Sequence, residues 1–386
     1  MKIIFQIFIF LSAIFLFSCG NPKENVKQES QTTKRDSGLI ADSGMVVCAH
    51  PLAAKVGVDI LKKGGNAIDA AVAVQFTLAV IYPNAGNIGG GGFMVVRMNR
   101  GEINSLDFRE KAPLNASRDM YLDKNGNVIP NLSTEGLLSV GVPGSVDGMF
   151  RAHEKYGKLP WKDLVQPAID LAEKGFSITK MQAEEMNETK NNFLKWNDSL
   201  CSLVNKEWKA GDMLIQKSLA KTLTLIRDKG KDGFYSGETA SNIVNEMKRK
   251  GGIISYDDLK NYESKWREPV VGWYKNYKII SMPPPSSGGI ALMQLLNMAE
   301  NFPVKDFGFN SEKSIHLFAE AEKRVYADRQ KYLGDPDFVS VPVKQLLDSL
   351  YIISRMKDFN PDKAKPSSEI SAGEFLPSPI GEGRNS

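Results

Sequence analysis

Residues 67–81, with the sequence AIDAAVAVQFTLAVI, constrain the fold more than any other segment. In a helix this sequence is apolar on nearly every side, so the helix must be buried between other layers. Its many alanines allow neighbouring backbones to approach closely. Asn66 is a favourable N-cap, and Gly64-Gly65 is typical of the end of a preceding helix that starts near Pro51. The segment therefore predicts a layered protein with a helix pair at its centre.

The remaining pattern predicts many helices and few strands. We expect a short buried strand at Met45–Ala49 and a hairpin of strands Phe93–Met98 and Ile103–Phe108, joined by a turn at residues 99–101. A late strand is expected at Tyr277–Met282. Further helices are predicted at residues 144–156, 161–174, 218–229, 238–249, 290–301 and 312–332. This order is not a regular βαβ alternation, so it favours helical layers over antiparallel strands.

The N-terminus has the features of an export signal. Lys2 precedes an apolar run from Ile3 to Phe17, which is shorter than the roughly 20 residues of a membrane span. The stretch LFSCG that follows resembles the bacterial lipoprotein box. We expect a signal peptide at residues 1–18, lipidation of Cys19, and a disordered tether over residues 19–43. An ordinary secretory signal with an incidental cysteine is the alternative.

Composition argues against two other kinds of site. The formal net charge is only +4 and the basic residues are scattered, which does not favour nucleic-acid binding. The cysteines after the signal and the histidines lie far apart and lack metal-ligand spacing, so we expect neither a metal nor an organic cofactor. These residues are Cys48, Cys201, His50, His153 and His316. The two cysteines are expected to be buried thiols, with one disulfide as the alternative.

Two small-residue stretches invite catalytic interpretations that their context does not favour. Residues 89–92 are four glycines, but a helix is predicted before them and a strand after them, the reverse of a phosphate-binding loop. We therefore expect them to permit a sharp bend and close packing. Ser286-Ser287-Gly288-Gly289 lacks a nucleophile-elbow pattern and a nearby base, so a turn leading into a helix is preferred.

Arg109, in the stretch LDFREKAP, is the candidate binding residue. Alternation along the strand places Asp107 and Arg109 on the same side. The arginine could form a structural ion pair with Asp107 or Glu110. Equally, its planar guanidinium could bind the two oxygens of a substrate carboxylate. The residues alone leave both interpretations open.

Six stretches in chain order together resemble the large subunit of bacterial γ-glutamyltransferase (γ-glutamyl transpeptidase), over residues 44–386. They are GGNAIDAAVAV, NIGGGGFMVVR, DFREKAP, GVPGSVDG, PPPSSGG and YADRQKYLGDPDF. The resemblance implies an α+β fold of the N-terminal-nucleophile hydrolase type, with four layers in the order αββα. Here that fold is expected to be incomplete, because the small-subunit half of the sandwich is missing.

The resemblance also implies a reaction. In the family, a precursor cuts itself before a threonine, and that threonine then attacks the γ-glutamyl amide of glutathione or a related donor. Water, an amino acid or a peptide accepts the acyl group. A segment resembling SPIGEGRNS precedes this threonine, so the nucleophile is expected after Ser386 and no catalytic residue is expected in this chain.

From the same resemblance, Arg109 is expected to bind the α-carboxylate of the donor, with Asp107 and Glu110 as hypothetical orienting partners. The expected partners are a small subunit from the same precursor and a membrane reached through the lipid anchor. The expected location is the bacterial cell envelope, facing the periplasm or the cell surface. The alternatives are a related N-terminal-nucleophile acylase, or an inactive envelope protein that only binds γ-glutamyl peptides.

Overall fold

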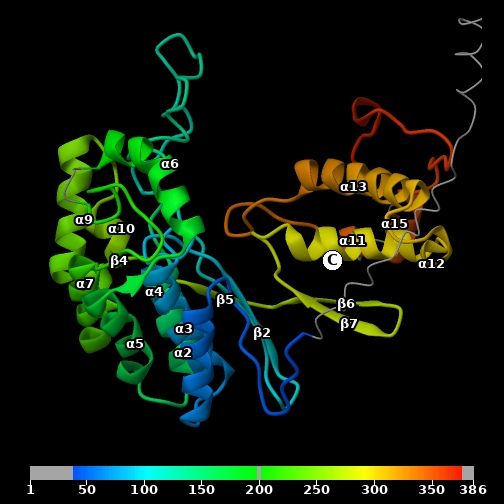
Figure 1. Ribbon diagram of the computed structural model, residues 1–386. Coiled ribbons are helices and arrows are strands. Elements are labelled where there is room, and N and C mark those ends of the chain that lie inside the picture. The colour runs from blue at the N-terminus through cyan, green and yellow to red at the C-terminus, as the bar shows by residue number, and fades with distance from the viewer. Residues whose placement is uncertain (1–37, 198–200, 376–386) are drawn as a thin grey trace, which may run out of the picture. The chain divides into compact units, whose positions relative to one another are not determined.

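The computed structural model describes residues 38–197 and 201–375 (Figure 1). The chain divides into two units, residues 1–45 and 46–386. Residues 38–45 of the first unit are exposed and form neither helix nor strand. The signal peptide and the lipidation predicted at Cys19 lie outside the described residues, and the proposed domain boundaries stay a prediction.

The helix pair predicted at the start of the second unit is confirmed. Helix α2 spans Pro51–Lys62 and α3 spans Ala67–Ile81. The Asn66 side chain accepts hydrogen bonds from the backbone N–H groups of Ile68 and Asp69, and the Asp69 carboxylate in turn accepts from the Asn66 N–H. This capping box fixes the start of α3, most of whose residues are buried.

The strand predicted at Met45–Ala49 is wrong. These residues have no assigned secondary structure, and three of the five are exposed. A strand is stabilised by a partner that satisfies its backbone groups. No described strand pairs with this segment, so its apolar composition alone is insufficient.

The predicted hairpin is confirmed and gains a third strand. Strands β1 (Phe93–Arg97) and β2 (Ile103–Asp107) are antiparallel, and β5 (Lys265–Arg267) pairs with the other edge of β2. In this register Leu106 lies opposite Met94 on one side and Trp266 on the other. The sheet thereby fixes the position at which the chain leaves β2, two residues before Arg109.

The described residues form two hydrophobic cores, and the larger one surrounds α3. Helix α3 packs against α2, α4 and α5, and α5 packs against α7. The helices of this part beyond α3 are α4 (Ser145–Tyr156), α5 (Trp161–Lys174), α6 (Lys180–Trp196), α7 (Lys217–Lys229), α8 (Asp232–Tyr235), α9 (Gly237–Lys250) and α10 (Tyr256–Lys260). This part also contains an antiparallel ribbon of two short strands, β3 (Phe176–Ser177) and β4 (Met213–Leu214).

The second core lies around α11 (Gly288–Glu300). Figure 1 shows α11 between α13 (Glu312–Tyr332) and the antiparallel ribbon of β6 (Val270–Tyr274) and β7 (Tyr277–Ser281). The late strand and both of these helices were predicted, within two residues at each end. The short elements α12 (Val304–Phe307), α14 (Val343–Leu346), α15 (Ser349–Ser354) and the 3₁₀ turn η1 (Ser367–Glu369) complete this part.

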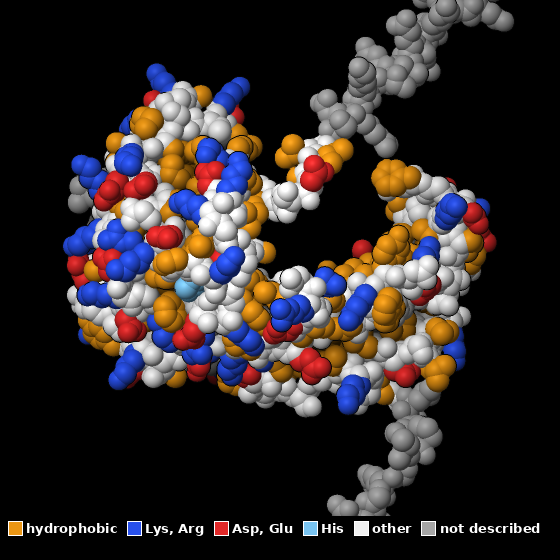
Figure 2. All heavy atoms as spheres, turned by 90° about the horizontal axis from the view of Figure 1, so that it is seen from below, with side chains coloured by type: hydrophobic (Ala, Val, Ile, Leu, Met, Phe, Trp, Pro, Cys, Tyr) orange, Lys and Arg blue, Asp and Glu red, His pale blue; other side chains and the backbone are white. Residues whose placement is uncertain are grey.

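The charged side chains are mixed in sign across the visible face. Figure 2 shows Lys and Arg interspersed with Asp and Glu, with exposed hydrophobic side chains between them. Among the described residues, no helix combines the length and the apolar character needed to span a bilayer.

Candidate functional site

Arg109 lies just beyond the end of β2 and is exposed. Its neighbours Leu106 and Phe108 are buried in the larger core, so the backbone is anchored immediately before the arginine. Within the described residues, the Arg109 guanidinium makes no hydrogen bond or ion pair. Its five N–H donors are therefore available to a ligand.

A cavity of about 440 Å³ opens beside this arginine. The segment after β2, strand β5, the turn before α11, and the end of α13 with its following loop all contribute to its lining. The charged lining residues are Asp107, Arg109, Glu110, Lys111, Arg267, Arg329, Asp335 and Asp337. Since both signs are present, the pairing among these groups decides which charges a ligand meets.

Asp107 does not pair with the arginine side chain. One carboxylate oxygen, Oδ1, accepts the backbone N–H of Arg109 at 3.1 Å, and the other, Oδ2, accepts the Arg267 Nε–H at 2.9 Å. Glu110 is exposed and makes no ion pair in the described part of the chain. The hypothesis that Asp107 and Glu110 orient the guanidinium is therefore wrong, because Asp107 instead holds the arginine backbone.

Arg267 is fully committed to carboxylates. It binds Asp337 with two hydrogen bonds, Nη1 to Oδ1 at 3.2 Å and Nη2 to Oδ2 at 3.1 Å. Lys265 also donates to Asp337 Oδ2 at 2.8 Å. The hydrogen bonds from Arg267, together with the one from Lys265, outweigh partial burial and lower the pKa of Asp337 to about 2. These three groups and Asp107 pair with one another, and none of the four pairs with the Arg109 guanidinium.

The other cations of the lining are more engaged than Arg109. Arg329 donates from Nε to Ser287 Oγ at 2.9 Å, and its guanidinium carbon lies 5.7 Å from the centroid of the Tyr326 ring. Lys111 donates to the carbonyl oxygen of Glu263 at 2.7 Å. Burial, followed by the nearby charge of Lys265, lowers the pKa of Lys111. Arg109 is therefore the best-placed group for a planar anion such as a carboxylate.

The glycine run packs against the backbone of this site. A Cβ atom at Gly91 would lie 2.5 Å from the Phe108 carbonyl oxygen and 2.9 Å from the Arg109 Cα. Gly92 and Phe108 also exchange two backbone hydrogen bonds. The close packing predicted for the run is confirmed, and its function is to let one segment lie directly against another.

The serine pair at the start of α11 forms a turn, as preferred from the sequence. Ser287 is the N-cap residue of α11, which begins at Gly288. Ser286 Oγ accepts the Gly288 N–H at 3.2 Å, and Ser287 Oγ accepts from Arg329. Both hydroxyls are thus engaged at a helix start.

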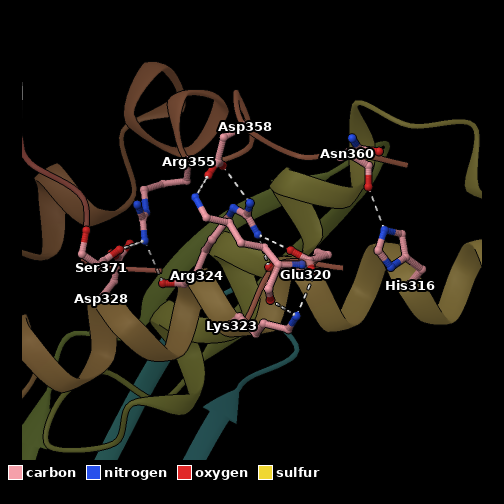
Figure 3. Close-up of polar contacts among 10 residues, drawn as sticks. His316, Glu320, Lys323, Arg324, Asp328, Arg355, Asp358, Asn360 and Ser371 are labelled. Atoms are coloured by element: carbon pink, nitrogen blue, oxygen red, sulfur yellow. Dashed lines mark hydrogen bonds and ion pairs between the residues drawn. The ribbon is translucent and has the colours of Figure 1, made fainter. Parts of the chain in front are cut away.

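A separate ion-pair network lies on α13, away from the cavity lining (Figure 3). Arg324, whose exposed fraction is 1 %, donates to Glu320 Oε2 at 2.9 Å and to Asp358 Oδ1 at 2.7 Å. Lys323 donates to Glu320 Oε1 at 2.6 Å. Burial opposes ionisation of Glu320, but the Lys323 and Arg324 hydrogen bonds prevail and lower its pKa to about 2.

Asp328 extends this network along α13. Its fully buried carboxylate accepts hydrogen bonds from the Tyr351 hydroxyl at 2.8 Å and the Gly373 N–H at 2.9 Å. Arg355 Nη2 lies 3.1 Å from Asp328 Oδ1 and also donates to the Ser371 carbonyl oxygen (Figure 3). The network therefore fastens residues 351–373 to α13 and has a structural role.

The histidines and cysteines form no site together. His50 caps α2, while His153 and His316 each bond a backbone oxygen. Cys48 and Cys201 are free and partly buried, so they form no disulfide with each other and are less buried than expected. In residues 38–197 and 201–375, no group of three or more His, Cys, Asp or Glu side chains is arranged to hold a metal ion.

The family model described as Gamma-glutamyltranspeptidase matches residues 53–381. The chain belongs to this family. A glutathione hydrolase proenzyme from Pseudomonas sp. strain A14 is 49 % identical over 336 residues, which cover 86 % of this chain and 58 % of that protein. This chain thus spans about 58 % of the length of that curated relative.

Comparison with solved structures identifies the same family by its fold. The crystal structure of Helicobacter pylori gamma-glutamyltranspeptidase matches with a TM-score of 0.84 and 48 % identity, covering 90 % of this chain and 99 % of that one. The expected α+β fold of the N-terminal-nucleophile hydrolase type is therefore confirmed. A more distant family relative, an acylase ACY 1 proenzyme from Pseudomonas sp. strain SE83, is 37 % identical over 86 % of this chain and 61 % of that protein.

Proposed function

We propose that this chain is the large-subunit part of an enzyme that cleaves γ-glutamyl amides, such as glutathione, and transfers the glutamyl group to water, an amino acid or a peptide. The single observation that carries the proposal is the exposed Arg109 guanidinium at a cavity of about 440 Å³, unpaired within the part of the chain that the structure describes. The similarity to glutathione hydrolase proenzymes supports the reaction type.

In this proposal Arg109 binds the donor rather than reacting with it. A guanidinium can donate two parallel hydrogen bonds to a carboxylate, which fixes both the position and the plane of the α-carboxylate. The γ-carbonyl is then held at a defined distance from the nucleophile. Such positioning converts binding energy into a higher rate because less orientational freedom is lost during reaction.

The nucleophile is proposed to be an N-terminal threonine on a small subunit that this sequence does not contain. Its hydroxyl attacks the γ-carbonyl, the amine leaves with a proton, and an ester forms with the enzyme. Water or an amine then releases the glutamyl group. The 58–59 % coverage of proenzyme relatives supports a second segment.

The proposal includes a place in the cell. The apolar run and the LFSCG stretch support export and lipidation at Cys19, with the folded part at the surface of an envelope membrane. Radiolabelled palmitate incorporated by the natural protein, and lost in Cys19→Ala, would test this. A secreted protein without label would contradict lipidation.

An acylase for substrates without an α-amino acid end is the second candidate, because acylases are also relatives. The processed protein, expressed from a gene that includes the threonine segment, should be tested with γ-glutamyl-p-nitroanilide and glutaryl-p-nitroanilide. The proposed function predicts faster cleavage of the γ-glutamyl compound. A preference for the glutaryl compound would favour the acylase, and cleavage of neither would favour a protein that only binds.

A further inference from the structure

The backbone of Arg109 is held on both sides, although its side chain bonds none of the other described residues. Its N–H donates to Asp107 Oδ1 at 3.1 Å, and its carbonyl oxygen accepts the Tyr262 hydroxyl at 2.8 Å. Tyr262 follows α10 and is 153 residues away in sequence. A part of the chain that is distant in sequence therefore holds the backbone of the candidate binding residue.

The Tyr262 ring has little freedom to move. It is 4 % exposed and stacks on Tyr235, with ring centroids 5.6 Å apart and an interplanar angle of 5°. The Lys111 ammonium lies 5.0 Å from the centroid of the Tyr262 ring. Because neighbouring groups restrain the ring, the direction of its hydroxyl is set before any ligand arrives.

A glycine makes room for this hydroxyl. A Cβ atom at Gly144 would lie 2.0 Å from the Tyr262 Oη and 2.1 Å from the Phe108 carbonyl oxygen. Burial, followed by the negative charges of Asp147 and Asp107, raises the pKa of Tyr262. The hydroxyl accordingly stays protonated at neutral pH and remains a donor to Arg109.

Tyr235 provides an internal comparison. It is buried to a similar degree. Its hydroxyl donates to the Pro143 carbonyl oxygen at 2.8 Å and accepts the Asp147 N–H at 3.4 Å. The two stacked tyrosines thus make the same kind of bond to two different segments. Only the bond from Tyr262 reaches Arg109.

We propose that Tyr262 is a positioning residue for the γ-glutamyl donor, acting through the carbonyl group of Arg109. This inference rests on the proposed function. Because hydrogen bonds hold both the N–H and the carbonyl oxygen of Arg109, the direction of its Cα–Cβ bond is fixed. The guanidinium can then occupy a smaller volume. Donor binding then orders fewer degrees of freedom, which lowers the cost of association. Losing the Tyr262 hydroxyl should weaken donor binding without slowing the reaction of the bound donor.

The test compares Tyr262→Phe with Tyr235→Phe in the processed enzyme. Each change removes one hydroxyl bonded to a backbone carbonyl and keeps the ring. For γ-glutamyl-p-nitroanilide, Tyr262→Phe should raise KM about three- to tenfold, the equivalent of one net hydrogen bond, with kcat within about twofold of the wild type. Tyr235→Phe should lower the melting temperature similarly but leave this KM unchanged.

A second donor separates positioning from general damage. The compound 4-aminobutanoyl-p-nitroanilide has the same reacting amide but no α-carboxylate. Tyr262→Phe should reduce the ratio of kcat/KM values for the γ-glutamyl donor over this analogue. Because both donors are measured on one preparation, an incompletely folded sample does not change the ratio.

The outcomes distinguish this inference from the proposed function. If wild-type enzyme is active and Arg109→Lys raises the donor KM, but Tyr262→Phe changes neither KM nor the donor ratio, the positioning role is overturned. An equal KM increase in the two tyrosine variants also overturns it. If the wild type cleaves no γ-glutamyl donor, the proposed function itself fails, and this inference with it. If the wild type is active but Arg109→Lys has no effect, donor binding by Arg109 fails, and this inference with it.

Discussion

Asp107 joins Arg267 to the backbone of Arg109. Its two carboxylate oxygens are divided between them, with Arg267 Nε at 2.9 Å and the Arg109 nitrogen at 3.1 Å. The Asp107 carboxylate is thus occupied by Arg267 rather than by the guanidinium two residues along the chain. From the sequence, Asp107 looks like a partner that would neutralise Arg109. In the structure Asp107 pairs with Arg267 instead, so it leaves the Arg109 side chain available to a ligand.

Replacing Arg267 should destabilise the site. Arg267→Gln would leave two partly buried carboxylates, Asp107 and Asp337, without their main cation. We expect a loss of about 2–4 kcal/mol in the free energy of unfolding, measured by urea denaturation, and a higher donor KM. Arg227→Gln is the control, because its pair with Asp228 is more exposed and should contribute at most about 1 kcal/mol. Equal losses in both variants would contradict this interpretation.

The glycine run offers a matched pair of substitutions. Gly91→Ala would place a methyl group 2.5 Å from the Phe108 carbonyl oxygen, so the backbone at Arg109 must shift. We expect a loss of about 1–3 kcal/mol in stability and a higher donor KM. Gly89→Ala meets nothing within 4 Å and should change neither quantity by much. Urea denaturation and the donor KM should be measured for both variants. Equal effects of Gly91→Ala and Gly89→Ala would contradict a specific role for the close contact at Gly91.

The network on α13 predicts acid sensitivity. The Glu320 pKa is about 2 in the folded protein, below its value of 4.5 in the unfolded chain, so the unfolded state binds the proton more readily. Its stabilising contribution is present above about pH 4.5 and is lost as the pH falls toward 2. Glu320→Gln should lower stability at pH 7 and reduce the further loss between pH 7 and pH 3. A variant with the same loss over this range as the wild type would exclude Glu320 as a source.

His50 should add a milder pH dependence at higher pH. Its Nδ1 accepts the Leu52 N–H, and burial lowers its pKa below 6.5, so protonation is disfavoured in the folded state. The contribution is present above pH 6.5 and is lost as the pH falls below it. His50→Asn keeps a capping oxygen without a titrating group and should remove about 1 kcal/mol or less of this dependence. Thermal midpoints at pH 7.5 and 5.5 would measure it.

The sequence predicted the helices whose ends carry strong local signals. Asn66 before α3 and the apolar alternation of β2 are local features, and both elements formed as expected. Helix α6 was not predicted, because its sequence is mostly polar and only three of its residues are buried. Strand β6 was also missed, since its main support is pairing with β7.

The candidate site was predictable only in part. Arg109 was found because it lies in a recognisable stretch of sequence. The residues around it were not predicted. Tyr262 contacts the Arg109 carbonyl oxygen. Arg267 contacts Asp107, and Asp337 contacts Arg267. All three lie more than 150 residues from Arg109, and no local pattern connects them to it. Adjacent charges in sequence suggested the wrong partner for Asp107, since the ends of strands β2 and β5 bring Arg267 closer.

The most direct measurement is the donor KM of Arg109→Lys in the processed enzyme, with Arg118→Lys as control because Arg118 is almost fully exposed and outside the cavity lining. Lysine keeps the charge but loses the two-pronged geometry. We predict that Arg109→Lys raises KM for γ-glutamyl-p-nitroanilide about 10- to 100-fold, with little change for 4-aminobutanoyl-p-nitroanilide. An unchanged KM for the γ-glutamyl donor, or an equal increase for both compounds, would contradict carboxylate binding by Arg109.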